Sequence, residues 1–112
     1  MDAFLGPASG RLVVLRDAAV LRVVLGGAVD LVVRERDTPA LWEALDDPQV
    51  RAVEVDAGAV TFLDSSGLSV LVRLARDAAE RGLPLRLVAL SPRVDYLLEQ
   101  TGVGEWMAAI GR

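Results

Sequence analysis

The segment that most constrains the fold is a junction between a strand and a helix at residues 63–68, with the sequence LDSSGL. Residues 51–56, shortly before it, alternate apolar and polar side chains, which predicts a buried strand. From Ser66 to Arg81, apolar residues recur every three or four positions, which predicts an amphipathic helix. The adjacent hydroxyls of Ser65 and Ser66 are therefore expected at a helix N-terminus. Free backbone N–H groups and the helix dipole there can hold an added phosphate.

The remaining elements are predicted from the same kinds of pattern. Two β-branched runs joined by a short connection predict a hairpin whose second strand ends at Gly26-Gly27. Thr or Ser followed by Pro predicts a helix start, and Gly58 predicts a loop after residue 56. The expected strands are Arg11–Arg16, Val20–Leu25 and Leu85–Leu90, and the expected helix starts are Thr38-Pro39 and Ser91-Pro92, the latter helix ending at Gly102.

Alternation of strands and helices in the second half of the chain predicts an α/β fold. We expect a mixed β-sheet of about four to five strands packed with about four helices. The length of 112 residues fits one domain. Residues 1–10 predict a flexible N-terminal lead-in, and residues 11–112 the folded domain. The segment Ala28–Arg36 is compatible with either a strand or a helix.

The composition excludes several classes of chemistry. The chain has no His and no Cys, and its 12 basic residues are all Arg. Imidazole or thiolate metal sites, Ser-His-Asp triads, cysteine nucleophiles and lysine Schiff bases are therefore excluded. We expect no metal and no cofactor. A net charge of −4 with scattered Arg residues argues against nucleic acid and anionic membranes as partners. No membrane insertion and no secretion signal are predicted, so we expect a cytoplasmic protein.

Four segments carry a resemblance to a known family. They are Gly27-Ala28-Val29-Asp30, Phe62–Leu68, Ser91-Pro92 with Val94, Leu97 and Leu98, and Thr101-Gly102-Val103. With these segments, residues 11–107 resemble a STAS domain, and specifically the bacterial anti-sigma factor antagonists. The Asp-Ser-Ser-Gly element at residues 64–67 is the most specific of the four.

The resemblance implies a function in partner switching during transcription control, including stress responses. A protein of this kind binds an anti-sigma factor that is also a serine kinase, and thereby frees a sigma factor. Phosphorylation of Ser65 ends the binding, and a PP2C-type phosphatase restores it. Asp64, Ser66, Gly67 and Asp30 are then expected on or beside the partner surface. The protein would be a kinase substrate and not an enzyme.

Several alternatives stay open. The residues Asp64-Ser65-Ser66-Gly67 also fit an ordinary helix cap, in which Gly67 tolerates an unusual backbone angle. The same fold could serve as a constitutive STAS subunit of a lipid-transport ATPase complex, with the loop hydroxyl unmodified. A carboxylate pair formed by Asp56 and Asp64 would suggest a hydrolase or a metal site. Trp42 and Trp106 are expected in the core rather than at a ligand or interface.

One segment departs from the family pattern. Between Asp30 and the expected helix start at Pro39 lie the residues Leu31–Thr38, where the resemblance leads us to expect fewer. The helix that follows is expected to be short. Because this region contributes to the partner surface in the family, the extension bears on which partner is bound.

Overall fold

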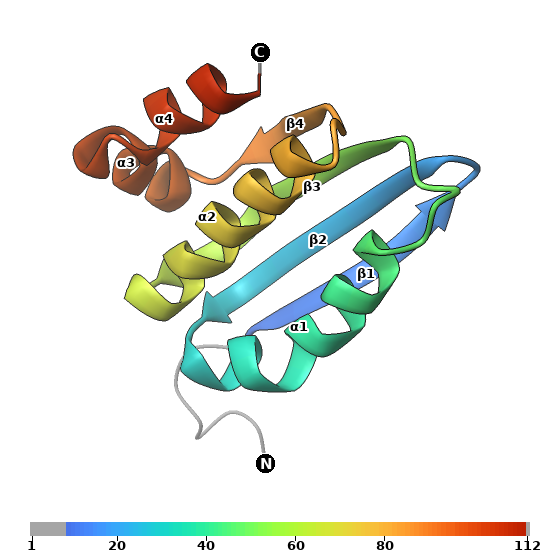
Figure 1. The fold of residues 1–112 in the computed structure, drawn as a ribbon. Helices are drawn as coiled ribbons and strands as arrows, with labels where there is room; N and C mark the ends of the chain where they lie inside the picture. The colour runs from blue at the N-terminus through green and yellow to red at the C-terminus, as the bar shows by residue number, and fades with distance from the viewer. Residues whose placement is uncertain (1–8, 112) are drawn as a thin grey trace.

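The computed structural model describes residues 9–111, which form a four-stranded sheet with helices packed against it (Figure 1). The strands are β1 (Arg11–Asp17), β2 (Val20–Val29), β3 (Ala52–Leu63) and β4 (Leu85–Leu90). The helices are α1 (Leu31–Leu45), α2 (Ser65–Glu80), α3 (Pro92–Thr101) and α4 (Val103–Ile110). The predicted α/β class and mixed sheet are confirmed. The predicted lead-in over residues 1–10 lies, up to residue 8, outside the described residues.

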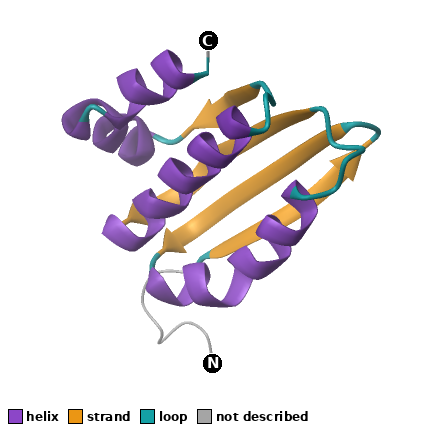
Figure 2. Cartoon of the chain, in the orientation of Figure 1, coloured by secondary structure: helices purple, strands orange, loops and turns teal. Residues whose placement is uncertain are grey.

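The sheet has the simple order β1-β2-β3-β4. Strands β1 and β2 form the predicted antiparallel hairpin, whereas the β2–β3 and β3–β4 pairs are parallel. Helices α1 and α2 lie side by side over one face of the sheet, and α3 and α4 lie near β4 (Figure 2). The core between helices and sheet is aliphatic. Its largest fully buried side chains are Leu21, Leu25, Leu41, Leu63, Leu71 and Leu74.

Strand β2 does not end at Gly26-Gly27, as the sequence predicted, but continues to Val29. Gly27 has a φ of +69° and lies at an irregularity in the pairing with β3. The ladder resumes after it, with Ala28 opposite Phe62 and Val29 opposite Leu63. The two glycines therefore lie at irregularities in the ladder without ending the strand, and β2 and β3 stop side by side.

Helix α1 begins eight residues before the predicted start at Thr38-Pro39, and its N-cap is Asp30. Thr38 is instead a buried helical residue whose hydroxyl donates to the Arg34 carbonyl oxygen (2.5 Å). Pro39 lies inside the helix on its exposed side. The predicted extension Leu31–Thr38 is thus the first half of a helix of 15 residues, which is not shortened.

Strand β3 is also longer than predicted, because no loop forms at Gly58. The strand is paired with β2 and β4 up to Ala57, and beyond Gly58 its pairing with β2 continues, through irregularities in register, to Leu63. Asp56 therefore lies in mid-strand and not at a strand end. About 26 Å of extended chain separates it from Asp64, at roughly 3.3 Å per residue. The two carboxylates cannot form the pair that a hydrolase or a metal site would need.

The C-terminal half follows the predicted pattern closely. Ser91 is the N-cap of α3, where its hydroxyl accepts from the backbone N–H of Val94, and Pro92 occupies the first turn. Gly102, with a φ of +76°, ends α3 in the left-handed conformation that glycine favours. At the end of α2, Gly82 has a φ of +69° and the Leu83 N–H donates to the Ala78 carbonyl (2.8 Å). Local capping signals were sufficient to predict both ends of α3.

Two side chains of α1 cover part of the free edge of β1. The Leu12 N–H donates to Asp37 Oδ2 (2.9 Å), and Arg36 Nη2 donates to the Gly10 carbonyl (2.8 Å). Arg36 also donates to both carboxylate oxygens of Asp37, at 2.7 and 2.8 Å. The Arg36–Asp37 pair therefore satisfies backbone groups that another strand would otherwise bind, which protects the edge against pairing with a second chain.

This arrangement predicts a pH-dependent contribution to stability. The hydrogen bonds from Arg36 hold the pKa of Asp37 below its usual value. A lowered pKa means that the charged form stabilises the fold above the unfolded pKa, near 4, and that this contribution falls as the pH drops through the folded pKa. We expect Asp37→Asn to lower the free energy of unfolding by about 1–2 kcal/mol at pH 7. The difference from the unsubstituted protein should shrink below about pH 4.

Urea unfolding at pH 7, 5, 4 and 3 measures this difference. Glu99→Gln is the control, because it removes an exposed carboxylate from α3 and should change stability by less than about 0.5 kcal/mol. A loss for Asp37→Asn that is equally large at pH 3 and pH 7 would contradict the assignment.

Candidate functional site

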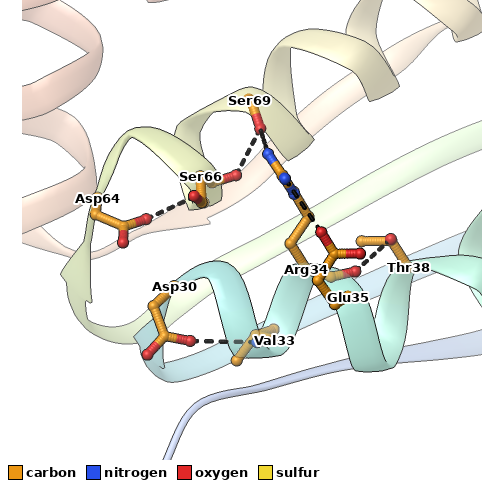
Figure 3. Close-up of polar contacts among 9 residues, drawn as sticks. Asp30, Val33, Arg34, Glu35, Thr38, Asp64, Ser66 and Ser69 are labelled. Carbon is orange, nitrogen blue, oxygen red and sulfur yellow. Dashed lines mark hydrogen bonds and ion pairs between the residues drawn. The ribbon is translucent and has the colours of Figure 1, made fainter.

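The candidate site lies where two neighbouring parallel strands end and two helices begin. Val29 and Leu63 are the last residues of β2 and β3 and are paired with each other. Asp30 and Asp64 follow them directly and are the N-caps of α1 and α2. Asp30 Oδ1 accepts from the Val33 N–H (3.2 Å), as Figure 3 shows. The topology thus brings together two Asp residues that lie 34 positions apart in the sequence (64 − 30).

Ser65 is the first residue of α2, directly after the capping aspartate. Asp64 Oδ1 accepts from the Gly67 N–H at 2.9 Å, and the Asp64 carbonyl accepts from Leu68 (2.8 Å). Ser65 is exposed, whereas Ser66 and Asp64 are half-buried. The first N–H groups of a helix have no partner within it, so the dipole of α2 is directed at the region around Ser65.

Gly67 is required for a different reason from the one the sequence suggested. It does not have a positive φ. It is buried against the ends of both strands, and a Cβ atom there would lie 2.4 Å from the Val29 carbonyl oxygen and 2.5 Å from Leu63 Cδ1. The absence of a side chain therefore allows α2 to begin directly on the sheet.

Exposed apolar side chains also lie at this end of the sheet. Leu31 and Val32 in the first turn of α1 are 49% and 62% exposed, and Phe62 at the end of β3 is 43% exposed. We call the surface formed by Asp30, Leu31, Val32, Phe62, Asp64 and Ser65 the junction surface. Sequence reasoning missed its apolar members. The sequence does contain a signal for two of them. The buried face of α1 begins at Val33, so Leu31 and Val32, which follow Asp30, lie outside it. Finding this signal requires knowing that the helix begins at Leu31.

A groove of about 570 Å³ runs between α1 and α2 and starts near the junction surface. Arg34 of α1 reaches across it, and its Nη1 donates to Ser69 Oγ of α2 (3.4 Å). Ser69 Oγ in turn donates to the Ser66 carbonyl (2.6 Å), as seen in Figure 3. Arg73 and Arg76 line the groove further along α2. The groove thus places one arginine beside the start of α2.

The two tryptophans are half-buried rather than fully enclosed. Both pack against the edge of the core. Trp42 also lines the α1–α2 groove, and the Arg73 guanidinium lies 4.0 Å from the centre of its ring. At this distance the cation is attracted by the ring face. Both tryptophans therefore pack against the core, as expected, and each also keeps part of its side chain exposed.

Within residues 9–111, the structure contains no cluster of three or more His, Cys, Asp or Glu residues that could hold a metal ion. None of the helices in that range is both long and apolar enough to cross a bilayer. The junction surface therefore offers carboxylates, a hydroxyl, a helix N-terminus and apolar side chains. These groups suit recognition of another protein.

Comparison with known proteins gives results that agree with one another. The STAS domain family model matches residues 12–111. The anti-sigma-B factor antagonists of Listeria monocytogenes serovar 1/2a and Listeria innocua serovar 6a are each 30% identical over 93 residues, covering 80% of this chain and 78% of theirs.

Two solved structures share the fold. The unphosphorylated anti-sigma factor antagonist SpoIIAA aligns with a TM-score of 0.73 and 20% identity, covering 85% of this chain and 84% of that one. An anti-sigma factor antagonist from Mycobacterium paratuberculosis aligns with a TM-score of 0.61 and 27% identity, covering 87% and 81%. The family match spans nearly the whole described chain and the relatives agree with it: this protein belongs to the STAS domain family, and the relatives named above are anti-sigma factor antagonists.

Proposed function

We propose that this protein is an anti-sigma factor antagonist of the partner-switching type. In the unphosphorylated form it binds an anti-sigma factor that is also a serine kinase, through the junction surface. Phosphorylation of Ser65 releases it, and a PP2C-type phosphatase reverses the modification. The protein acts in the cytoplasm as a kinase substrate and not as an enzyme. The relatives named as anti-sigma-B factor antagonists support the general class.

The observation that carries the proposal is the placement of Ser65. It is an exposed hydroxyl at the first position of α2, directly after a capping carboxylate and at the end of the sheet where Leu31, Val32 and Phe62 are exposed. An ordinary N-cap needs only Asp64, which already accepts the Gly67 N–H. Capping of the helix therefore does not explain why Ser65 follows Asp64. The side chain of Ser65 is exposed and accessible to a kinase.

The switch follows from a difference in cost between two states. A phosphoserine adds about −1.5 to −2 charges at neutral pH. In the free protein this charge is exposed to water at the positive end of a helix, which favours it. In a complex the same charge lies beside Asp64 and Asp30 and within apolar surface that the partner must desolvate. The modification therefore opposes binding while the fold tolerates it.

The remaining predicted residues have distinct parts in this proposal. Asp64 fixes the start of α2 and adds negative charge next to the modified hydroxyl. Gly67 allows the first turn of α2 to pack closely against the sheet. Asp30 caps α1 in the same way that Asp64 caps α2. Ser66 is half-buried and is the less accessible of the two hydroxyls. Partner contact is therefore centred on Ser65 and the apolar side chains around it.

Phosphorylation by the cognate kinase tests the proposal directly. The protein is incubated with kinase and ATP, and the product is mapped by mass spectrometry. We expect one phosphate, on Ser65, and none in a Ser65→Ala variant, while Ser66→Ala is still modified. Phosphate on Ser66 alone, or on neither hydroxyl, would overturn the mechanism. Co-purification of a membrane ATPase with an unmodified protein would favour a constitutive subunit instead.

A further inference from the structure

The α1–α2 groove places a cation on the same side of α2 as Ser65. Ser65 and Ser69 are four residues apart in one helix, so their side chains are neighbours on one face, with Cβ atoms about 6 Å apart. The guanidinium of Arg34 contacts Ser69 Oγ from the opposite helix. An arginine from α1 is therefore within about one helical turn of the Ser65 hydroxyl.

The present contacts of Arg34 are weak enough to be exchanged. Its hydrogen bond to Ser69 is long, at 3.4 Å. Its other partner is Glu35, at 3.2 Å, an ion pair whose side chains are 39% and 68% exposed. Exposed pairs of this kind contribute little to stability. A dianionic phosphate with three acceptor oxygens is a stronger partner for a guanidinium, which can bind two of them at once.

We propose that Arg34 binds the phosphate carried by Ser65 and so holds the modified side chain at the mouth of the α1–α2 groove. This inference rests on the proposed function, since it concerns the phosphorylated form. Arg34 exchanges its contact with Ser69 for the phosphate oxygens. The free N–H groups at the start of α2 contribute from the other side. The released state is thereby stabilised by an ion pair that spans both helices.

Other charged groups near the phosphate determine how the pair can be detected. Asp64 and Asp30 at the two caps and Glu35 on α1 are negative and disfavour the dianion. The guanidinium carbon of Arg93, on α3, lies 6.0 Å from the centre of the Phe62 ring on β3. Arg93 is the cation that competes with Arg34 for the phosphate. A nearby guanidinium favours the dianion over the monoanion and lowers the second pKa of the phosphate. Arg34 should thus be the group that keeps this pKa low despite the carboxylates.

Phosphorus NMR on protein carrying phosphoserine at position 65 measures this pKa. The phosphoserine is installed during translation, so the experiment needs neither the kinase nor a partner and is independent of whether the proposed function is correct. We expect Arg34→Gln to raise the second phosphate pKa by about one unit, and Arg34→Lys to restore most of the lowering. Strong salt should reduce the difference.

Two variants separate a local pair from a general charge effect. Arg73→Gln removes the same charge from the same groove, but two turns further along α2 than Ser65. The distance from Arg73 to the phosphate exceeds the Debye length, so this variant should leave the phosphate pKa within about 0.2 units. Arg93→Gln tests the competing cation. An unchanged pKa in Arg34→Gln, an equal rise in Arg73→Gln, or a rise confined to Arg93→Gln would each overturn the assignment.

Discussion

Replacing Ser65 by glutamate is expected to weaken binding to the cognate anti-sigma factor at least about 100-fold, which corresponds to ~2.7 kcal/mol. The new carboxylate lies beside Asp64 on a surface that the partner must desolvate. The substitution therefore destabilises the complex but not the free protein, which lowers the affinity. The loss should be mainly in the dissociation rate. Calorimetry or surface plasmon resonance with the purified anti-sigma factor measures both the affinity and the rates.

Two controls separate charge from size and from position. Ser65→Gln introduces a side chain of the same shape without the charge and should weaken binding by less than about tenfold. Gln100→Glu adds the same charge on an exposed position of α3 and should leave the affinity within about twofold. Equal affinities for the glutamine and glutamate variants at position 65 would show that charge is not what ejects the partner.

Replacing Gly67 by alanine is expected to lower the free energy of unfolding by about 2–3 kcal/mol. The added methyl group would meet the Val29 backbone oxygen at 2.4 Å and Leu63 Cδ1 at 2.5 Å, and neither strand end can withdraw without breaking its pairing with the other. Helix α2 must therefore move off the sheet or the strand ends must separate. Urea unfolding at pH 7 measures the loss.

Ser66→Ala, at the adjacent position, is the matched control and should change stability by less than about 0.5 kcal/mol. The Gly67→Ala protein should also show altered amide chemical shifts at Val29 and Leu63, since these residues receive the new contact. A stability within 0.5 kcal/mol of the unsubstituted protein would mean that the start of α2 is looser than the structure shows.

The parts of the fold that the sequence predicted well are those specified by neighbouring residues. The N-cap Ser91 with Pro92 at the start of α3 and Gly102 at its end each determine their local backbone without help from distant contacts. The LDSSGL junction belongs to the same class, because Asp64 caps α2 through a residue three positions away. The motif therefore predicted correctly where α2 begins.

The errors arose where tertiary packing outweighs local preference. Thr38-Pro39 is a strong local signal for a helix start, yet burial of Val33 and Thr38 extends α1 back to Asp30. Gly58 is a typical loop residue, but β3 passes through it because its pairing with β2 resumes at Ala59. Local composition does not reveal which segments will be flanked by others, so these elements could not be assigned from their own residues.

The same reasoning explains which members of the site were missed. Phe62 and Val32 lie 30 positions apart, and they come to the same end of the sheet only because β2 and β3 are parallel neighbours that end together. Arg34 meets Ser69 only because α1 and α2 lie on the same face of the sheet. Each of these relations depends on topology. Both relations can be derived once the order and the register of the strands are known.

The close seat of α2 on the ends of β2 and β3 also limits how the molecule can respond to a chemical signal. Gly67 leaves no free space beneath the first turn, and that turn is tied to strands at the centre of the sheet. Under the proposed function, we therefore expect phosphorylation of Ser65 to leave the backbone of this turn in place. The partner would then detect the change in charge and in side-chain position, and neither phosphorylation nor dephosphorylation would require refolding.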